Sequence, residues 1–272
     1  TDFARNAQIV QLDIDASQLG NRVKADLDIK ADCADFFTGF ENKLANQLIM
    51  DREWMACLAQ HWTENFIDEY KDWSVSPFAI CKLFEASFSS LPVHYVADVG
   101  NNQMWAAHSI LLNQGQAIHH SGGLGAMGFA IPTAIGVAYA TQAPVVVLTG
   151  DGGAQLNIQE LDIIAREQLP ILTIVFNNES LGMVRAFQEM YFDGRNESTY
   201  WNGYSSSFCS LGRAYNITSF STSSTDELET LLSRFAAHPE PMLIEILMSD
   251  ARECRPRLAF GNPIDKQFPV KS

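Results

Sequence analysis

Two oxygen-bearing side chains follow two apolar runs of the sequence. Asp151 comes after the run at residues 145–148, and Asn178 comes after the run at residues 171–176. The carboxyl ends of neighbouring parallel strands meet at one edge of a sheet, which would bring the two side chains together. Mg²⁺ prefers oxygen ligands, takes one or two protein side chains and completes its shell with phosphate oxygens and water. The spacing therefore predicts a site for Mg²⁺ that carries a diphosphate.

The glycines around Asp151 suit this chemistry. Gly150 and Gly152 let the chain turn sharply from a strand into a helix and let backbone N–H groups approach an anion. Taken singly, Gly-Asp-Gly is more simply interpreted as a turn and Asn177-Asn178 as a loop. Both segments nevertheless end β-branched runs, and a helical pattern at residues 156–168 connects them. The combination favours a metal and diphosphate site.

Three longer segments narrow the comparison to one enzyme family. Together with the two segments above, they resemble the thiamine diphosphate enzymes of the acetohydroxyacid synthase (acetolactate synthase) family, over about residues 76–245. The resemblance implies thiamine diphosphate and Mg²⁺ as cofactors and a small 2-oxo acid such as pyruvate as substrate. The segments are residues 99–107 (VGNNQMWAA), 121–129 (SGGLGAMGF) and 177–184 (NNESLGMV).

The resemblance also implies roles for individual residues. Mg²⁺ is expected to bind the side chains of Asp151 and Asn178 and the backbone carbonyl of Ser180. Met127 is expected to wedge between the two rings of the cofactor and hold it in a V shape, while Met183 lines the cofactor. The residues expected to contact the cofactor are Gly100, Asn101, Asn102, Gly125, Met127, Gly150, Asp151, Gly152, Gly153, Asn178, Ser180, Leu181, Gly182 and Met183.

Two positions depart from the family pattern. The synthases usually have Gln-His where this chain has Asn101-Asn102, and these amides can still donate hydrogen bonds to phosphate, although Asn102 cannot be charged. The synthases commonly have a tryptophan that shapes the acceptor pocket where this chain has Phe187. Met127, Met183 and Phe187 are the residues predicted to shape the reaction site, and the second substrate stays open.

The activity that the resemblance implies is a carboligation. CO₂ leaves the 2-oxo acid, and the remaining two-carbon unit is joined to a second carbonyl. The glutamate that activates the cofactor belongs to the family's N-terminal domain and reaches the site across a dimer interface, so the chain alone is expected to be nearly inactive. Two alternatives stay open, namely another activity on the same scaffold (a 2-oxo acid decarboxylase, an oxidase or a keto-sugar carboligase) and a noncatalytic subunit.

The length of the chain bears on its domain organisation. A subunit of the resembled family is about twice as long as these 272 residues, so this chain is expected to be the C-terminal half. We expect residues 1–38 to be the end of a middle domain, 39–75 a connecting helical segment, and 76–272 the thiamine diphosphate- and Mg-binding domain. A strand is predicted at residues 9–14, without a partner nearby in the sequence.

Strand and helix patterns alternate from residue 93 onward. Fully apolar strands between amphipathic helices are typical of an α/β fold, a doubly wound parallel sheet with helices on both faces, as in the thiamine diphosphate-binding fold. Strands are predicted at residues 93–97, 145–149, 171–176, 217–220 and 243–247, and helices at 123–140, 157–168, 204–214 and 226–235.

One motif points to a different class of enzyme. Residues 123–128 match G-x-G-x-x-G, the fingerprint of dinucleotide-binding oxidoreductases, and begin a predicted helix. No strand is expected before it, because His119-His120-Ser121 precedes it, and no acidic residue closes a following strand. The oxidoreductase interpretation is therefore disfavoured. His119 and His120 could line a substrate entrance, although histidines in loops are more often solvated.

Composition limits the partners. The formal net charge of −14 and the pI near 4.7 argue against nucleic acid and anionic membranes. Five cysteines without a CxxC pair argue against disulfides and zinc and favour a reducing cytoplasm. No apolar run reaches the length of a membrane span. A homodimer or homotetramer through the thiamine diphosphate domains is expected from the resemblance.

Overall fold

The computed structural model describes residues 6–44, 52–68, 76–201, 204–248, 254–255, 257–263 and 266–268. The chain forms two compact units, one from Thr1–Trp62 with Pro256–Ser272 and a larger one from Thr63–Arg255. Helix α2 (Arg52–Asp68) crosses from the first unit into the second and lies within the helical segment predicted at residues 39–75. The domain boundaries predicted at residues 38 and 75 stay predictions.

The smaller unit contains a short parallel pair of strands. β1 (Val10–Asp13) pairs with β2 (Leu27–Lys30). The strand predicted at residues 9–14 is therefore confirmed, but the expectation that it lacks a nearby partner was wrong. The backbone N–H of Ile9 donates to the Asp26 carboxylate at 2.7 Å, which holds the returning chain alongside β1. The unit also contains α1 (Cys33–Leu44) and an antiparallel pair, β9 (Arg257–Leu258) with β10 (Gln267–Phe268).

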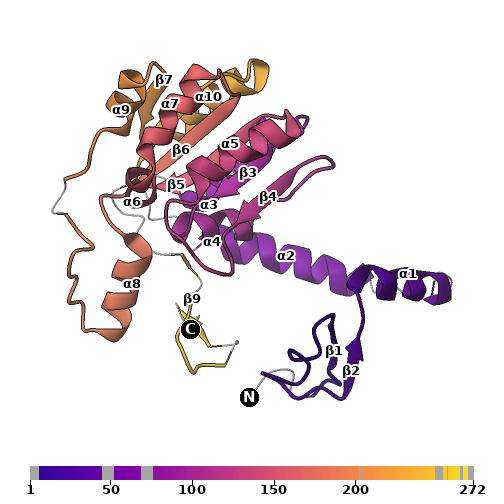
Figure 1. Cartoon of the computed structure of the whole chain (residues 1–272). Helices are drawn as coiled ribbons and strands as arrows, with labels where there is room; N and C mark the ends of the chain where they lie inside the picture. The colour runs from indigo at the N-terminus through magenta and orange to yellow at the C-terminus, as the bar shows by residue number, and fades with distance from the viewer. Residues whose placement is uncertain are drawn as a thin grey trace. The chain divides into compact units, whose positions relative to one another are not determined.

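The larger unit is built on one six-stranded parallel sheet (Figure 1). Its strand order is β4-β3-β5-β6-β8-β7, and all of its strand pairs are parallel. This confirms the predicted fold class. The strands are β3 (His94–Ala97), β4 (Ala117–His120), β5 (Val145–Gly150), β6 (Ile171–Asn177), β7 (Thr218–Thr222) and β8 (Met242–Leu247).

Each face of the sheet has its own hydrophobic core. Tyr95 and Ala97 of β3 belong to one core, whereas Val96 belongs to the other, because successive side chains of a strand point to opposite faces. The first core contains residues of α3 (Pro77–Ser87), α4 (Asn101–Ser109) and α10 (Thr225–Ala237). The second contains residues of α5 (Ala130–Thr141), α7 (Leu161–Arg166) and α9 (Phe208–Ala214). Helices therefore cover both faces, and the sheet is doubly wound.

The glycine-rich segment differs from its prediction. β4 ends at His120, so the segment does follow a strand, and the expectation that no strand precedes it was wrong. The helix expected from residue 123 begins at Ala130 instead. Gly125 and Gly128 have φ of +71° and +88°, in the left-handed region that a right-handed helix cannot use. The segment is a loop that enters α5.

The other helices follow the predicted pattern with shifted ends. The helix expected at residues 157–168 is a 3₁₀ turn (Ile158–Glu160) followed by α7, and the one expected at 204–214 is the shorter α9. Four helices of the larger unit were not predicted. They are α3, α4, α6 (Asp151–Leu156) and α8 (Gly182–Tyr191).

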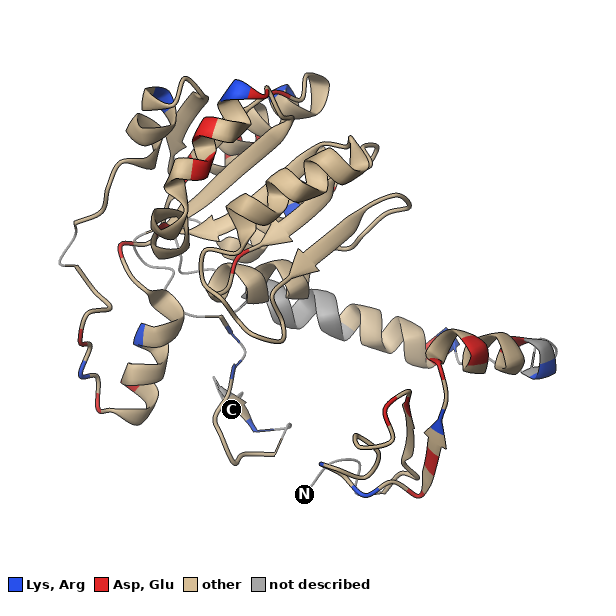
Figure 2. Cartoon of the chain, viewed as in Figure 1, with Lys and Arg blue, Asp and Glu red and all other residues tan. Residues whose placement is uncertain are grey.

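Charged residues lie mainly on helices and loops rather than on the sheet (Figure 2). Glu245, in β8, is a buried exception. All five cysteines are free thiols. Within the described ranges, no helix has the length and apolarity that crossing a membrane requires.

Candidate active site

A cavity of about 220 Å³ lies where the order of the strands in the sheet reverses. From β3 the chain passes to β4 on one side, and β5 then lies on the other side of β3. Ligands of open α/β sheets bind beyond the carboxyl ends of the strands at such a point. All of the residues expected to contact the cofactor line this cavity. The lining is completed by Val99, Trp105, Phe176 and Val184.

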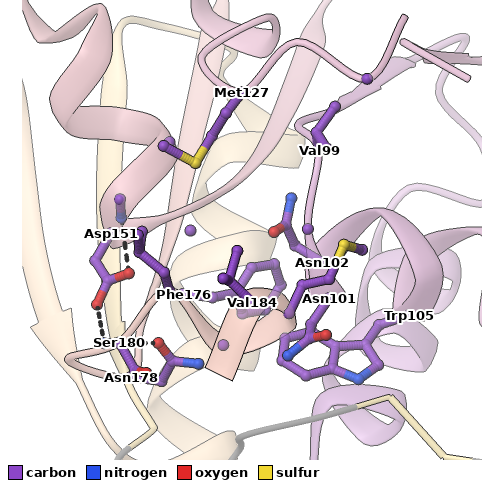
Figure 3. Close-up of a pocket in the computed structure, with 18 residues that line it drawn as sticks. Val99, Asn101, Asn102, Trp105, Met127, Asp151, Phe176, Asn178, Ser180 and Val184 are labelled. Carbon is purple, nitrogen blue, oxygen red and sulfur yellow. Dashed lines mark hydrogen bonds between the residues drawn. The ribbon is translucent and has the colours of Figure 1, made fainter. Parts of the chain in front are cut away.

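The oxygen donors predicted for Mg²⁺ meet at one wall (Figure 3). Asp151 is buried, and its Oδ1 and Oδ2 accept the backbone N–H groups of Gly152 at 2.7 Å and Ser180 at 3.1 Å. Asn178 Oδ1 accepts the same Ser180 N–H at 3.2 Å. A carboxylate and a carboxamide that share one donor are hard oxygen ligands close enough together to bind one small cation. The donor set fits Mg²⁺.

The electrostatics of Asp151 favour a cation at this wall. Burial raises the pKa of its carboxyl from 3.8 to about 6, although the backbone N–H groups of Gly152, Ser180, Glu179 and Asn178 act in the opposite direction. Burial therefore outweighs the hydrogen bonds, and the charge remains undercompensated. A bound cation would supply the missing compensation. In the described part of the chain, no three His, Cys, Asp or Glu side chains gather into an alternative metal site.

Two methionines supply apolar surface to the cavity. The Met127 side chain, which is 39% exposed, comes from the loop between β4 and α5 and stands over the cavity on a different side from Asn178 and Ser180 (Figure 3). Met183, in the first turn of α8, is 36% exposed and also lines the cavity. The wall of oxygens and the apolar cover suit a ligand with a charged end and a flat organic end.

Comparison with known proteins decides the family. The model of the thiamine pyrophosphate enzyme C-terminal TPP binding domain matches residues 98–246, which include every lining residue of the cavity. The chain belongs to the thiamine pyrophosphate enzymes. The dinucleotide interpretation of residues 123–128 is thereby set aside.

Relatives within this family carry acetolactate synthase names. A probable acetolactate synthase large subunit of Methanocaldococcus jannaschii is 31% identical over 92% of this chain and 43% of its own length. The large subunit of Cyanidium caldarium is 29% identical over 96% of this chain and 45% of its own, and that of Lactococcus lactis subsp. lactis is 31% identical over 97% and 46%. The chain therefore spans less than half the length of these relatives.

The sequence suggested that the Asn102 amide donates to phosphate, but its side chain is hydrogen-bonded within the protein. Its Nδ2 donates to the backbone carbonyls of Asp98 at 2.8 Å and Leu148 at 3.0 Å. Carbonyls only accept, so both amide hydrogens are engaged and neither is available to phosphate. The Oδ1 atom faces Gly100, where an added Cβ would lie only 2.9 Å away. Asn102 lines the cavity, but it joins β3 to β5 rather than offering an N–H group.

Phe187 lies outside the cavity lining. The helix α8 carries its ring one turn beyond Met183 and Val184, where it is 43% exposed and lies 4.7 Å from Tyr191 and 5.9 Å from Phe192 between ring centroids. Met183 and Val184, on the same helix, do line the cavity. Of the three residues predicted to shape the reaction site, Met127 and Met183 both line the cavity, and Phe187 lies further along α8, outside the lining.

The histidines predicted at a substrate entrance also lie outside the lining of the described cavity. His119 Nε2 is 3.1 Å from His94 Nδ1, and the two rings stack across strands β4 and β3. Burial, and secondarily the neighbouring His119, lower the pKa of His94. The same two causes lower the pKa of His120. These histidines are part of the edge of the sheet.

Sequence reasoning missed Asp98, a carboxylate directly behind the cavity. It follows β3 as Asp151 follows β5, so the pattern that identified Asp151 was present at residues 94–98 as well. Val99, Trp105, Phe176 and Val184 were also missed as lining residues, since apolar side chains carry no pattern that separates lining from core.

Proposed function

We propose that this chain is the diphosphate- and Mg-binding half of a thiamine diphosphate-dependent carboligase, similar to acetolactate synthase. The complete protein would decarboxylate a small 2-oxo acid such as pyruvate and join the two-carbon unit to a second carbonyl. One observation carries the proposal. Residues from four separate strand ends, chosen from sequence resemblance alone, all line a single cavity at the switch point of the sheet.

Thiamine diphosphate, when bound, supplies the electron sink for the decarboxylation, and the protein supplies binding and orientation. Asp151, Asn178 and the Ser180 carbonyl would hold Mg²⁺. The backbone N–H of Gly153, near the start of α6, would bind the diphosphate, whereas the Gly152 N–H already donates to Asp151. Met127 and Met183 would pack on the organic part of the cofactor and keep water from it.

The proposed architecture is tested with two proteins, this chain alone and the complete protein with all the sequence that its gene encodes. We expect the complete protein to release CO₂ from pyruvate with Mg²⁺ and thiamine diphosphate. The chain alone should be nearly inactive, because no residue of it takes the role of the activating glutamate. Turnover by the chain alone at the rate of the complete protein would contradict the proposal.

A second candidate is another thiamine diphosphate activity on the same scaffold. It is favoured by Asn102, whose amide hydrogens are engaged with backbone carbonyls, and by Phe187 on the exposed face of α8. The resemblance to the synthases places Phe187 at the acceptor pocket of the complete protein, although it lies outside the cavity of this chain. If the carboligase and this placement are correct, Phe187→Trp in the complete protein should shift products from acetolactate towards acetohydroxybutyrate by about tenfold, since apolar pocket changes are worth about 1–3 kcal/mol. Mass spectrometry of a competition between pyruvate and 2-oxobutyrate measures this ratio. CO₂ release or consumption of a keto-sugar without either product would favour the second candidate.

We also propose that the complete protein is a homodimer or homotetramer. The support is the face of α8 that begins at the cavity, where Met183, Val184 and Phe187 are all exposed and apolar. Sedimentation of the complete protein, and of a Val184→Lys variant, tests this. A wild-type monomer would contradict it. A cytoplasmic location and the lack of nucleic acid and membrane partners stay predictions.

A further inference from the structure

Asp98 is a buried carboxylate that touches neither the cavity nor a cation. Its side chain is 0% exposed, and none of the described Lys, Arg or His side chains pairs with it. Isolated buried charges are costly, so they persist where hydrogen bonds satisfy them. Four donors do so here. They are the N–H groups of Val99 (2.7 Å), Gly128 (2.9 Å) and Ala130 (3.3 Å) and the Thr149 hydroxyl (3.2 Å).

These donors come from three separate parts of the site. Val99 begins the segment after β3, Gly128 and Ala130 join the Met127 loop to α5, and Thr149 precedes Gly150-Asp151 on β5. The Asp98 carboxylate thus links the loop that carries Met127 to strand β5, which ends directly before Asp151. Ala130 is also the first residue of α5, where unpaired N–H groups and the helix dipole stabilise an anion.

The link acts directly on the backbone of Met127. The N–H that Gly128 donates to Asp98 belongs to the peptide group whose carbonyl is that of Met127. The Gly128 carbonyl accepts Asn157 Nδ2 at 2.7 Å, so both peptide groups of Gly128 are held. The earlier part of the loop, residues 122–126, is exposed. Asp98 and Asn157 are therefore the contacts that fix the chain immediately after Met127.

We propose that Asp98 is a positioning residue, which sets the place of Met127 over the cavity relative to Asp151 by holding the Gly128 peptide to strand β5. The inference rests on the proposed function in so far as Met127 packs on thiamine diphosphate. The anchoring of the loop is a property of the protein itself. The two parts are therefore tested by separate measurements.

The first measurement is hydrogen exchange in the cofactor-free complete protein. Asp98→Asn keeps the size of the side chain but replaces one acceptor oxygen by an NH₂ group. This group opposes one of the two loop N–H groups, because Gly128 donates to Oδ1 and Ala130 to Oδ2. The amides of Gly128 and Ala130 should then exchange at least about tenfold faster than in the wild type, because local opening becomes easier. Leu232→Val, a conservative core substitution in α10, is the control for a general loss of stability. In this variant the exchange rates of the Gly128 and Ala130 amides should keep their ratio to those of the other core amides. Unchanged exchange at Gly128 and Ala130 in Asp98→Asn would overturn the anchoring.

The second measurement is calorimetry of thiamine diphosphate binding with saturating Mg²⁺, as a cycle of Asp98→Asn and Met127→Ala. Loss of a supporting partner typically costs 10–100-fold, so Asp98→Asn should weaken binding by at least about tenfold. If Asp98 acts through Met127, the double variant should bind no more than about twofold weaker than Met127→Ala alone. Multiplying effects would overturn the positioning role. A wild type that binds no thiamine diphosphate would contradict the proposed function, and the exchange result would still decide the anchoring.

Discussion

Asp98 and Asp151 are two buried aspartates that directly follow adjacent strands, β3 and β5, but only Asp151 lines the cavity. Asp98 has four donors around its carboxylate and no contact with the cavity. Asp151 also has backbone N–H groups around its carboxylate, those of Gly152, Ser180, Glu179 and Asn178, but it lines the cavity. The same residue type at the same place on a strand is a structural anchor where neighbouring segments cover it and a candidate ligand where it lines the cavity.

The difference between the two aspartates lies in what surrounds them. The loop before α5 lies against Asp98 and supplies the N–H groups of Gly128 and Ala130. Asp151 is the first residue of α6 and lines the cavity. Substitution of either aspartate tests this difference.

The largest expected effect is on cofactor binding. Asp151→Ala should abolish Mg²⁺-dependent binding of thiamine diphosphate by the complete protein, with a loss of at least about 100-fold, because even partners beyond the direct ligands are worth 10–100-fold. Calorimetry at fixed Mg²⁺ measures the affinity. Asp162→Ala, an exposed aspartate on α7, is the matched control and should bind as the wild type does. Retained affinity in Asp151→Ala would remove the metal assignment.

The second prediction contrasts the two aspartates in metal-free protein. Asp98→Ala leaves the three N–H groups without their acceptor, while the Thr149 hydroxyl keeps the Gly150 carbonyl at 3.2 Å. It should lower the free energy of unfolding by about 3 kcal/mol or more. Asp151→Ala loses hydrogen bonds too, but it also removes an undercompensated buried charge, so its change should stay within about 1 kcal/mol. Denaturant titrations at pH 8 compare them. Equal losses of unfolding free energy in the two variants would contradict different roles for the two carboxylates.

The third prediction concerns pH. The folded-state pKa of Asp151 is raised to about 6 from 3.8, so this group contributes stability that is fully present below pH 3.8 and is lost as pH rises through 6. Relative to Asp151→Asn, the wild type should therefore lose up to about 3 kcal/mol of unfolding free energy as the pH rises across this window. Denaturant titrations of the metal-free protein from pH 4 to 8 measure it. Saturating Mg²⁺ should cancel the change, and a pH-independent difference would contradict the raised pKa.

The site was more predictable from sequence than the elements that carry it. Asp151, Asn178 and Met127 lie in segments whose residue types are dictated by the cofactor, so resemblance located them. The short edge strand β4 was missed because two of its four residues are histidines, whereas α8 was missed although Met183, Phe187 and Tyr191 recur in it at helical spacing. Asp98 was missed because its role depends on donors 30 and 51 residues away, and no local pattern records such contacts.

The smallest expected effect concerns the packing of α6 against Asp98 and Thr149. Gly153, in the first turns of α6, lies against the Asp98 side, where an added Cβ would be 2.8 Å from Thr149 Oγ1 and 3.1 Å from Asp98 Oδ2. Gly153→Ala should therefore destabilise the metal-free protein by about 1–3 kcal/mol, as overpacking does. Gly136, in α5, is the matched helical control, since nothing lies within 4 Å of an added Cβ there. Gly136→Ala should stabilise by about 0.5–1 kcal/mol through helix propensity alone. Thermal unfolding of both variants gives the sign directly, and a stabilised Gly153→Ala would mean that Asp98 and Thr149 have room to move away from α6.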